Sequence, residues 1–304
     1  MSPAEAHPGA SDAPGALAWD IADKVVLITG GTTGIGRATV EALAARGAHV
    51  VFTARDAALG QTVIDEVTAA TGNPSIEQRQ LNLDDLGAVR DFASDFAADH
   101  PALHVLVNNA AVMLRERRST VDGHELTFGV NHLGHFQLVC SLLPLIQASA
   151  PARILNVASD AHKWVRGIDF DDLSATNGRY GGRRGRQAYA ESKLANMLFT
   201  RELAKRLDPA KVTVNCLHPG AVRTRLGRDT EATRFSEVFW TVIGTFFTTP
   251  EKGAQTTVWA ATSPELTLVS GQYFAKSKIA SPSKKACDDG AAAKLWKISE
   301  DLTA

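Results

Sequence analysis

The chain has 304 residues, of which 44% are hydrophobic and 21% are charged, with 24 Gly and 12 Pro. This composition supplies a full apolar core and excludes a disordered, collagen-like or repeat protein. The formal net charge is -1 at pH 7, so no overall field attracts the chain to a nucleic acid or to an anionic membrane. The expected partner is therefore a small molecule.

The three cysteines show neither paired spacing nor the Cys/His spacing of a zinc site. We therefore predict reduced thiols, no metal site and a cytoplasmic protein. Residues 1–22 lack the basic and apolar segments of a signal peptide, and we expect a flexible tail there, followed by one domain over 23–304. The longest stretch without a charged side chain, 126–152, contains polar residues and a proline, which predicts a buried helix and no integral membrane segment.

Short β-branched strands alternate with helical patterns from residue 24 onward. The expected strands are 24–29, 48–54, 75–81, 103–109, 152–158 and 211–217, and the expected helices include 35–45, 57–70, 86–98, 126–143 and 187–207. Strands that are nearly continuous in Val, Ile and Leu are typical of a parallel sheet with helical crossovers, in which both faces are buried. The sequence therefore predicts a doubly wound α/β fold of the Rossmann type.

Two segments interrupt this alternation. Residues 160–186 are polar and rich in glycine, and we expect a surface loop that borders the substrate, with contact to an anionic ligand as an alternative. The arginines of this loop are Arg179, Arg183, Arg184 and Arg186. Residues 225–249 include a dense apolar patch over 235–249, which is expected to be either a core helix or a flap over a binding cleft.

The sequence TGGTTGIG places three glycines between a predicted strand and a predicted helix. A dinucleotide pyrophosphate needs backbone N–H groups at a helix N-terminus and no Cβ in the way, and this turn supplies both. A tight turn without a ligand is the plainer alternative. The residues expected to bind the cofactor here are Gly30, Thr32, Thr33, Gly34, Ile35 and Gly36.

The end of the second predicted strand selects between NAD(H) and NADP(H). A carboxylate there accepts a hydrogen bond from the ribose 2′-hydroxyl, whereas a guanidinium pairs with a 2′-phosphate. This chain has Ala54 followed by Arg55 at that place, and Arg37 adds to the positive electrostatic field there. NADP(H) is therefore the predicted cofactor, and NAD(H) is the weaker choice that the nearby Asp56 keeps open.

Tyr189 and Lys193 stand four residues apart in a helical stretch, so their side chains share one face. A nearby ammonium favours the phenolate, and we expect it to lower the pKa of Tyr189 so that the phenol exchanges a proton with a substrate hydroxyl or carbonyl. Ser159 ends a strand at the ligand-binding edge of the sheet and can donate to a carbonyl oxygen. Asn131 must bond to backbone or water if it is buried. No role is assigned to His132, His135 and His162.

Six ordered motifs make the chain resemble the short-chain dehydrogenase/reductase family over about 23–273. They are TGGTTGIG, NNAA, NHLGHF, NVAS, YAESK and HPGAVRT. The resemblance implies that Asn131, Ser159, Tyr189 and Lys193 form a catalytic tetrad. It also implies that Asn131 holds a water in a proton relay and that Lys193 bonds the nicotinamide ribose. The further cofactor contacts that it implies are Asn82, Leu83, Asn109, Ala110, Pro219, Gly220, Val222 and Thr224.

Within the family, the C-terminal half resembles the branch of retinol dehydrogenases and their bacterial relatives, which often prefers NADP(H). The chain departs from that branch at Asn82, where an adenine-binding Asp is common, and we expect no membrane anchor. We therefore expect an NADP(H)-dependent oxidoreductase that interconverts a carbonyl and an alcohol on a hydrophobic small molecule, as a homodimer or homotetramer. Two alternatives stay open: a catalytically silent NADP(H)-binding sensor or scaffold, and a double-bond or ring reductase on the same fold.

Overall fold

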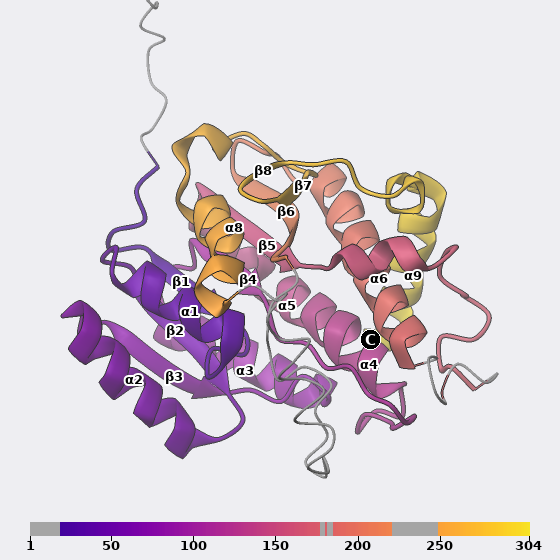
Figure 1. Cartoon of the computed structure of the whole chain (residues 1–304), viewed down its shortest axis with the longest axis horizontal. Helices are drawn as coiled ribbons and strands as arrows, with labels where there is room; N and C mark the ends of the chain where they lie inside the picture. Colours follow the sequence, from indigo (N-terminus) through magenta and orange to yellow (C-terminus); the bar gives the residue numbers. More distant parts are fainter. Residues whose placement is uncertain (1–18, 177–179, 181–184, 221–248) are drawn as a thin grey trace, which may run out of the picture.

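A computed structural model describes residues 19–176, 180, 185–220 and 249–304 (Figure 1). Within these residues, the strands form one 8-stranded sheet in the order β3-β2-β1-β4-β5-β6-β7-β8. Neighbouring strands are parallel, except that β7 and β8 are antiparallel. The strand order reverses between β1 and β4, which is the point where doubly wound sheets bind ligands. The predicted α/β fold is confirmed.

The predicted elements match the observed ones closely. The strands are β1 (Val25–Ile28), β2 (His49–Ala54), β3 (Ile76–Gln80), β4 (Val105–Asn108), β5 (Ala152–Val157), β6 (Val212–His218), β7 (Tyr273–Ala275) and β8 (Lys278–Ile279). The helices are α1 (Gly34–Ala44), α2 (Ala57–Thr71), α3 (Leu86–Asp99), α4 (Leu126–Phe128), α5 (Gly134–Ala148), α6 (Gly185–Arg206), α8 (Pro250–Thr262) and α9 (Asp289–Thr303). Short helical turns are η1 (Gly129–Leu133), η2 (Asp160–Trp164), η4 (Pro264–Leu266) and η5 (Lys284–Cys287).

The predicted helix over 126–143 differs most from the structure. It consists of α4, the π-helical turn η1 and α5 in succession, and α5 continues to Ala148 with Pro144 inside it. Gly129, Asn131 and other residues of η1 are buried, so the polar groups of this segment face protein rather than solvent. In the described ranges, no helix combines the length and the apolar character that crossing a membrane requires.

Helices cover both faces of the sheet (Figure 1). Alternate strand residues such as Ile28 and Phe52 enter one core with α1, α2 and α8. Their neighbours Leu27 and Val51 point the other way, into a core with α3, α5 and α6. Burial on both faces explains why the strands are rich in Val, Ile and Leu rather than alternating with polar residues.

The packed part of the chain begins earlier than the sequence indicated. Trp19 and Ile21 are buried in the core beside α1 and α8, although we expected residues 1–22 to form a flexible tail. The indole of Trp19 donates a hydrogen bond to the Ala261 carbonyl, 2.7 Å away. The packed core therefore includes Trp19 and Ile21, which we expected to belong to the tail. Burying the Trp19 ring removes apolar area from water, and local sequence preferences do not reveal that contact.

A buried arginine holds the end of α8 against this region. Arg153, on β5, donates to the carbonyl oxygens of Ala260 and Ser263, at 2.8 Å each. Its guanidinium carbon lies 3.9 Å from the centre of the Trp19 ring, and no carboxylate in the described part of the chain pairs with it. Burial lowers the pKa of Arg153 to about 10. The aromatic face and the negative end of the helix dipole therefore take the place of an anion.

Replacing this side chain tests its contribution. We expect Arg153→Met to lower the free energy of unfolding by about 2–4 kcal/mol, because two buried carbonyls lose charged hydrogen-bond donors. Denaturant unfolding followed by circular dichroism measures the change. The matched control is Arg206→Met, whose guanidinium also lies over a tryptophan ring but is 45% exposed and pairs with Glu202. Arg206→Met is expected to lower the free energy of unfolding by less than about 1 kcal/mol. Equal losses in the two variants would contradict the role given to the burial of Arg153.

Candidate active site

The polar residues that the sequence singled out meet at the carboxyl edge of the sheet. Ser159 follows β5, and its hydroxyl is hydrogen-bonded to Tyr189 on α6. Lys193, one turn further along α6, donates from Nζ to the Val157 carbonyl at 2.9 Å. The same ammonium lies 5.6 Å from the centre of the Tyr189 ring. Ser159, Tyr189 and Lys193 therefore form one cluster around the end of β5.

Burial controls the protonation of this cluster. Tyr189 is 9% and Lys193 is 2% exposed. Burial raises the pKa of Tyr189 to about 12, and the hydrogen bond with Ser159 acts in the opposite direction. Burial lowers the pKa of Lys193 to about 8, opposed by the nearby Cys216. The expected lowering of the tyrosine pKa is therefore wrong for this arrangement of side chains, in which desolvation is the largest effect, and at neutral pH Tyr189 is a phenol that can donate a proton.

Asn131 lies in the π-helical turn η1 and is fully buried. Its Oδ1 accepts from the Val112 backbone N–H at 2.8 Å. Its Nδ2 donates to the Val112 carbonyl and to Ser192 Oγ, at 2.9 Å each. The expectation that a buried Asn131 bonds to backbone is confirmed. The side chain thereby joins η1 to the segment after β4 and to α6, next to Lys193.

Two side chains with no predicted role, Thr29 and His135, extend this network. Thr29 Oγ1 accepts from the backbone N–H groups of Asn109 and Ala110, at 2.9 and 3.0 Å. His135 Nε2 lies 2.9 Å from the same oxygen, and its Nδ1 lies 3.3 Å from the Asn131 carbonyl. Burial lowers the pKa of His135 to about 4, so the ring is neutral, and a proton on Nδ1 satisfies both contacts. The only sign of this contact in the sequence is that His135 follows Asn131 by four residues.

The turn between β1 and α1 requires glycine at several positions. Gly30 and Gly34 have φ of +70° and +57°, which side chains of L-residues disfavour. A Cβ on Gly36 would lie 2.0 Å from the Gly30 carbonyl oxygen and 2.6 Å from Asn109 Nδ2. Asn109 Nδ2 in turn donates to the Thr29 and Gly30 carbonyls, at 2.8 and 3.2 Å. Asn109 therefore fixes the shape of the glycine turn.

The N-terminus of α1 is open toward this turn. Thr33 occupies the N-cap without a side-chain cap bond, and the first turn holds no acidic residue. The unpaired N–H groups lie at the positive end of the helix dipole, where an anion is stabilised. The uncapped helix and a cradle that a Cβ would fill both fit the pyrophosphate of a dinucleotide.

The end of β2 lies beside the glycine turn. Thr53 Oγ1 accepts from the Gly30 backbone N–H at 3.1 Å. Ala54 is buried, and Arg55, the next residue, is exposed. No ion pair of Arg55 is found in the part of the chain that the structure describes. Its guanidinium is therefore available to a ligand.

The other charged groups of this region are already engaged. Asp56 caps α2, because its Oδ1 accepts from the Leu59 backbone N–H at 3.1 Å. Arg37 pairs with Glu66 at 2.5 Å, and both side chains are partly exposed. Asp56, the carboxylate that left NAD(H) as the alternative cofactor, is thus already hydrogen-bonded within the protein.

The remaining predicted cofactor positions differ in their surroundings. Asn82, after β3, is exposed, whereas Leu83 is buried with its carbonyl oxygen against Gly134. Pro219 and Gly220 follow β6 and are half-buried, and Gly220 has a φ of +89°. The predicted positions that lie outside the described residues are Val222, Thr224, Arg179, Arg183, Arg184 and the apolar patch up to residue 248.

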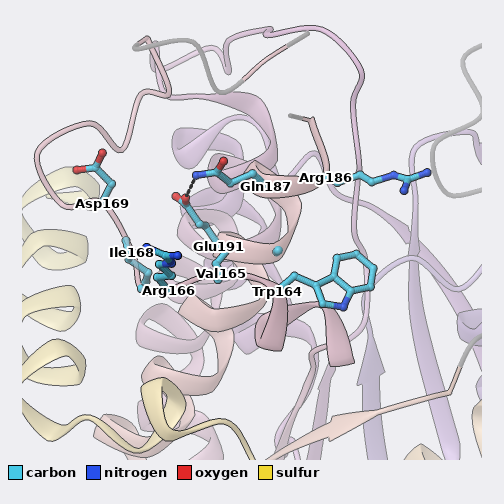
Figure 2. A pocket seen from close by; sticks show the side chains of 10 residues that line it. Trp164, Val165, Arg166, Ile168, Asp169, Arg186, Gln187 and Glu191 are labelled. Carbon is cyan, nitrogen blue, oxygen red and sulfur yellow. Dashed lines mark hydrogen bonds between the residues drawn. The ribbon is translucent and has the colours of Figure 1, made fainter. Parts of the chain in front are cut away.

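A cavity of about 880 Å³ opens between α6 and the segment after η2 (Figure 2). Trp164, Val165 and Ile168 line it together with charged side chains, among them Arg186. Gln187 Nε2 donates to Glu191 Oε1 at 2.9 Å in one wall. Val165 also packs against the small apolar cluster that includes the Tyr189 ring. The cavity therefore shares Val165 and Ala190 with the apolar cluster that contains Tyr189, although Tyr189 is not one of its lining residues.

Comparison with known proteins identifies the family. Residues 24–166 and 173–234 match the short chain dehydrogenase family. The chain belongs to this family. It is 42% identical to retinol dehydrogenase 11 of Homo sapiens over 279 residues, which cover 92% of this chain and 85% of the relative. It is 43% identical to retinol dehydrogenase 12 of Homo sapiens over 279 residues, which cover 92% and 86%. The predicted resemblance is confirmed, and the protein is an alcohol/carbonyl oxidoreductase of a family that uses NAD(P).

Solved structures share the fold. An uncharacterized protein from Mycobacterium paratuberculosis is 32% identical, with a TM-score of 0.73 over 95% of this chain and 96% of that chain. A short chain dehydrogenase from Escherichia coli complexed with NADPH is 21% identical, with a TM-score of 0.64 over 87% and 100%. The second likeness is one of fold alone.

Proposed function

We propose that this protein is an NADP(H)-dependent oxidoreductase that interconverts a carbonyl and an alcohol, with Tyr189 as the group that exchanges the proton. The observation that carries the proposal is the cluster of Ser159, Tyr189 and Lys193 at the end of β5. Hydrogen bonds through Thr29, His135, Asn131 and Ser192 link this cluster to a glycine turn that fits a pyrophosphate. A silent sensor or scaffold would need the glycine turn but not a phenol held between a hydroxyl and a buried ammonium.

Each group of the cluster has a distinct role. Bound nicotinamide supplies or accepts the hydride. In the reducing direction, Tyr189 donates its phenolic proton to the substrate oxygen, and Ser159 stabilises the negative charge that develops there. Lys193 then stabilises the tyrosinate, because its ammonium is held beside the ring by the Val157 carbonyl. Lys193 and Tyr189 are also the residues of the cluster that we expect near the nicotinamide ribose.

Asn131 and His135 are assigned positioning roles. Both amide protons and the carbonyl oxygen of Asn131 are engaged with Val112 and Ser192, so this side chain sets the distance between η1 and α6. To the water relay that the resemblance implies for Asn131 we add a role of its side chain in placing α6. The pair formed by His135 and Thr29 continues the link to β1.

The preference for NADP(H) rests on Arg55. The guanidinium is exposed beside the glycine turn, whereas Asp56 is occupied in capping α2. A free arginine and a missing carboxylate favour a 2′-phosphate over a 2′-hydroxyl. All three cysteines are free thiols, which agrees with a reducing compartment such as the cytoplasm.

Removing this guanidinium should change cofactor choice. We expect Arg55→Ala to weaken NADPH binding by about 10–100-fold, the loss of a charge-assisted hydrogen bond, and to leave NADH binding unchanged. Titration of nicotinamide fluorescence measures both dissociation constants. Arg46→Ala, which removes an exposed arginine near the far end of α1, is the control for net charge. Equal weakening of the two cofactors would contradict the assignment.

Changing Tyr189 separates chemistry from binding. We expect Tyr189→Phe to lower kcat by about 10²–10⁴-fold, because the ring packing is kept while the proton is lost. The dissociation constant for NADPH should stay within about twofold. A screen of aldehydes, ketones and alcohols that follows NADPH absorbance in both directions supplies the substrate. It also separates this activity from a double-bond or ring reductase, which would consume NADPH only with unsaturated compounds.

Tyr180→Phe is the matched control for that experiment. The Tyr180 hydroxyl contacts Thr127 and donates to Glu125, away from Ser159, so near-normal kcat is expected. Full activity in Tyr189→Phe would require a different proton donor and would overturn the proposed function.

The substrate is proposed to be hydrophobic, with its chain in the cavity beside Tyr189. Trp164 is 67% exposed and presents a large apolar surface to this space, together with Val165 and Ile168. Covering such surface stabilises a complex by roughly 25 cal/mol per Å² of apolar area removed from water. The charged side chains around it leave room for a polar group on the same substrate.

Trp164→Ala tests this placement. The Michaelis constant for long apolar aldehydes should rise at least about fivefold, whereas that for short ones should change little, because only the long chain reaches the indole. Leu268→Ala is the control, since Leu268 is 66% exposed but lies outside the cavity lining. An effect that is independent of chain length would place the substrate elsewhere.

A further inference from the structure

A cluster of imidazole and carboxylate groups lies at the other edge of the sheet from Ser159. His49 begins β2, Glu77 is the second residue of β3, and His100 is the C-cap residue of α3. The amino ends of these parallel strands point away from the carboxyl edge that carries the glycine turn. The three elements belong to the indigo-to-purple part of the molecule, at the β3 end of the sheet (Figure 1).

Strand register brings the cluster together. Glu77 pairs with Val51, two residues after His49, so the side chains of His49 and Glu77 share the face that α3 covers. His100 Nε2 lies 3.2 Å from Glu77 Oε2, and His49 Nε2 lies 4.0 Å from the same oxygen. One ligand atom of each residue lies within 4.8 Å of the others. Donor atoms around a tetrahedral zinc ion are about 3.4 Å apart, given metal bonds of about 2.1 Å, so small side-chain rotations close the gap.

The neighbours of the cluster orient its donors. His100 Nδ1 lies 3.3 Å from the Phe96 carbonyl, and a proton there leaves the lone pair of Nε2 directed at Glu77. The imidazole also stacks on the Phe96 ring, with centroids 4.2 Å apart. Arg79 holds the other carboxylate oxygen of Glu77 and pairs with Asp99 at 2.7 Å. Histidines that bind metals commonly donate their second ring N–H to a carbonyl in this way.

We propose that His49, Glu77 and His100 bind one divalent transition-metal ion of the Zn²⁺ type. Two imidazoles and a carboxylate are a ligand set that suits such ions, whereas Mg²⁺ and Ca²⁺ prefer oxygen alone. The side chains of His49 and Glu77 are 36% and 34% exposed, so an ion can enter and water can complete its coordination. The C-terminus of α3 adds the negative end of a helix dipole.

Such an ion would stabilise the fold without entering the reaction. It would join β2, β3 and the end of α3 through three ligands, each more than twenty residues from the next in the sequence. Because it binds the folded chain, thermal stability should rise with metal concentration. A metal-free ion pair between His100 and Glu77 is the competing account, and it predicts no such dependence.

The test uses full-length protein without a polyhistidine tag, freed of metal by a chelator. Calorimetric titration with Zn²⁺ should give one saturable site per chain, and Zn²⁺ at about a hundredfold excess over its dissociation constant should raise Tm by about 4 °C. Co²⁺ should produce visible absorption bands of a nitrogen- and oxygen-ligated ion, and Mg²⁺ should produce neither effect. The absence of saturable Zn²⁺ binding would overturn the proposal.

Variants locate the site. His49→Ala and Glu77→Gln should each weaken Zn²⁺ binding at least about a hundredfold and abolish the Tm shift. His124→Ala removes a histidine outside the cluster and should leave both unchanged. Circular dichroism of each variant confirms folding, and the isosteric Glu77→Gln serves if His49→Ala fails to fold. Zn²⁺ binding that survives in both cluster variants would assign the ion to other residues and would also overturn the proposal.

Discussion

The Thr29 hydroxyl is the point at which the two halves of the candidate active site meet. It accepts the N–H groups of Asn109 and Ala110, which follow β4, and it contacts His135 on α5. His135 leads to Asn131, whose side chain reaches Ser192 on α6. One continuous set of hydrogen bonds therefore runs from the end of β1, beside the glycine turn, to the helix that carries Tyr189 and Lys193. A change in any member would alter the distance between the glycine turn and Tyr189, the proposed proton donor.

The burial of Tyr189 and Lys193 also disfavours the charged forms of both side chains. Desolvation raises the pKa of Tyr189 and lowers that of Lys193, so both shifts disfavour a tyrosinate beside an ammonium. The Ser159 hydrogen bond and the Val157 carbonyl contact are the compensating interactions in the protein. In the proposed mechanism the tyrosinate forms only when a substrate oxygen takes the proton, which would tie proton transfer to the presence of substrate.

Family membership determines the reaction class more firmly than the substrate. The relatives match over nine-tenths of the chain, and the proposed catalytic cluster and the glycine turn lie at β1, β5, α1 and α6 of the shared fold. Half of the residues that line the cavity, 165–169, come from the segment after η2, a connection whose sequence departs from the strand-helix alternation. The proposed substrate preference therefore depends on residues of this connection such as Trp164, at the end of η2, and the shared fold does not fix their identity.

The sequence by itself determined six of the eight strands, most helices, the parallel character of the sheet and the family, because these follow from periodicity and from motifs within a few residues of one another. The short strands β7 and β8 were not predicted. The spacing of Tyr189 and Lys193 likewise needs only one helix. The π-helical turn at Asn131, the link from Thr29 to His135, the use of Asp56 as a cap and the direction of the Tyr189 pKa were decided by the tertiary structure. So were the burial of Trp19 over Arg153 and the meeting of His49, Glu77 and His100. Each of these depends on burial or on contacts that strand order and local backbone geometry establish, and no pattern in the sequence encodes those distances directly.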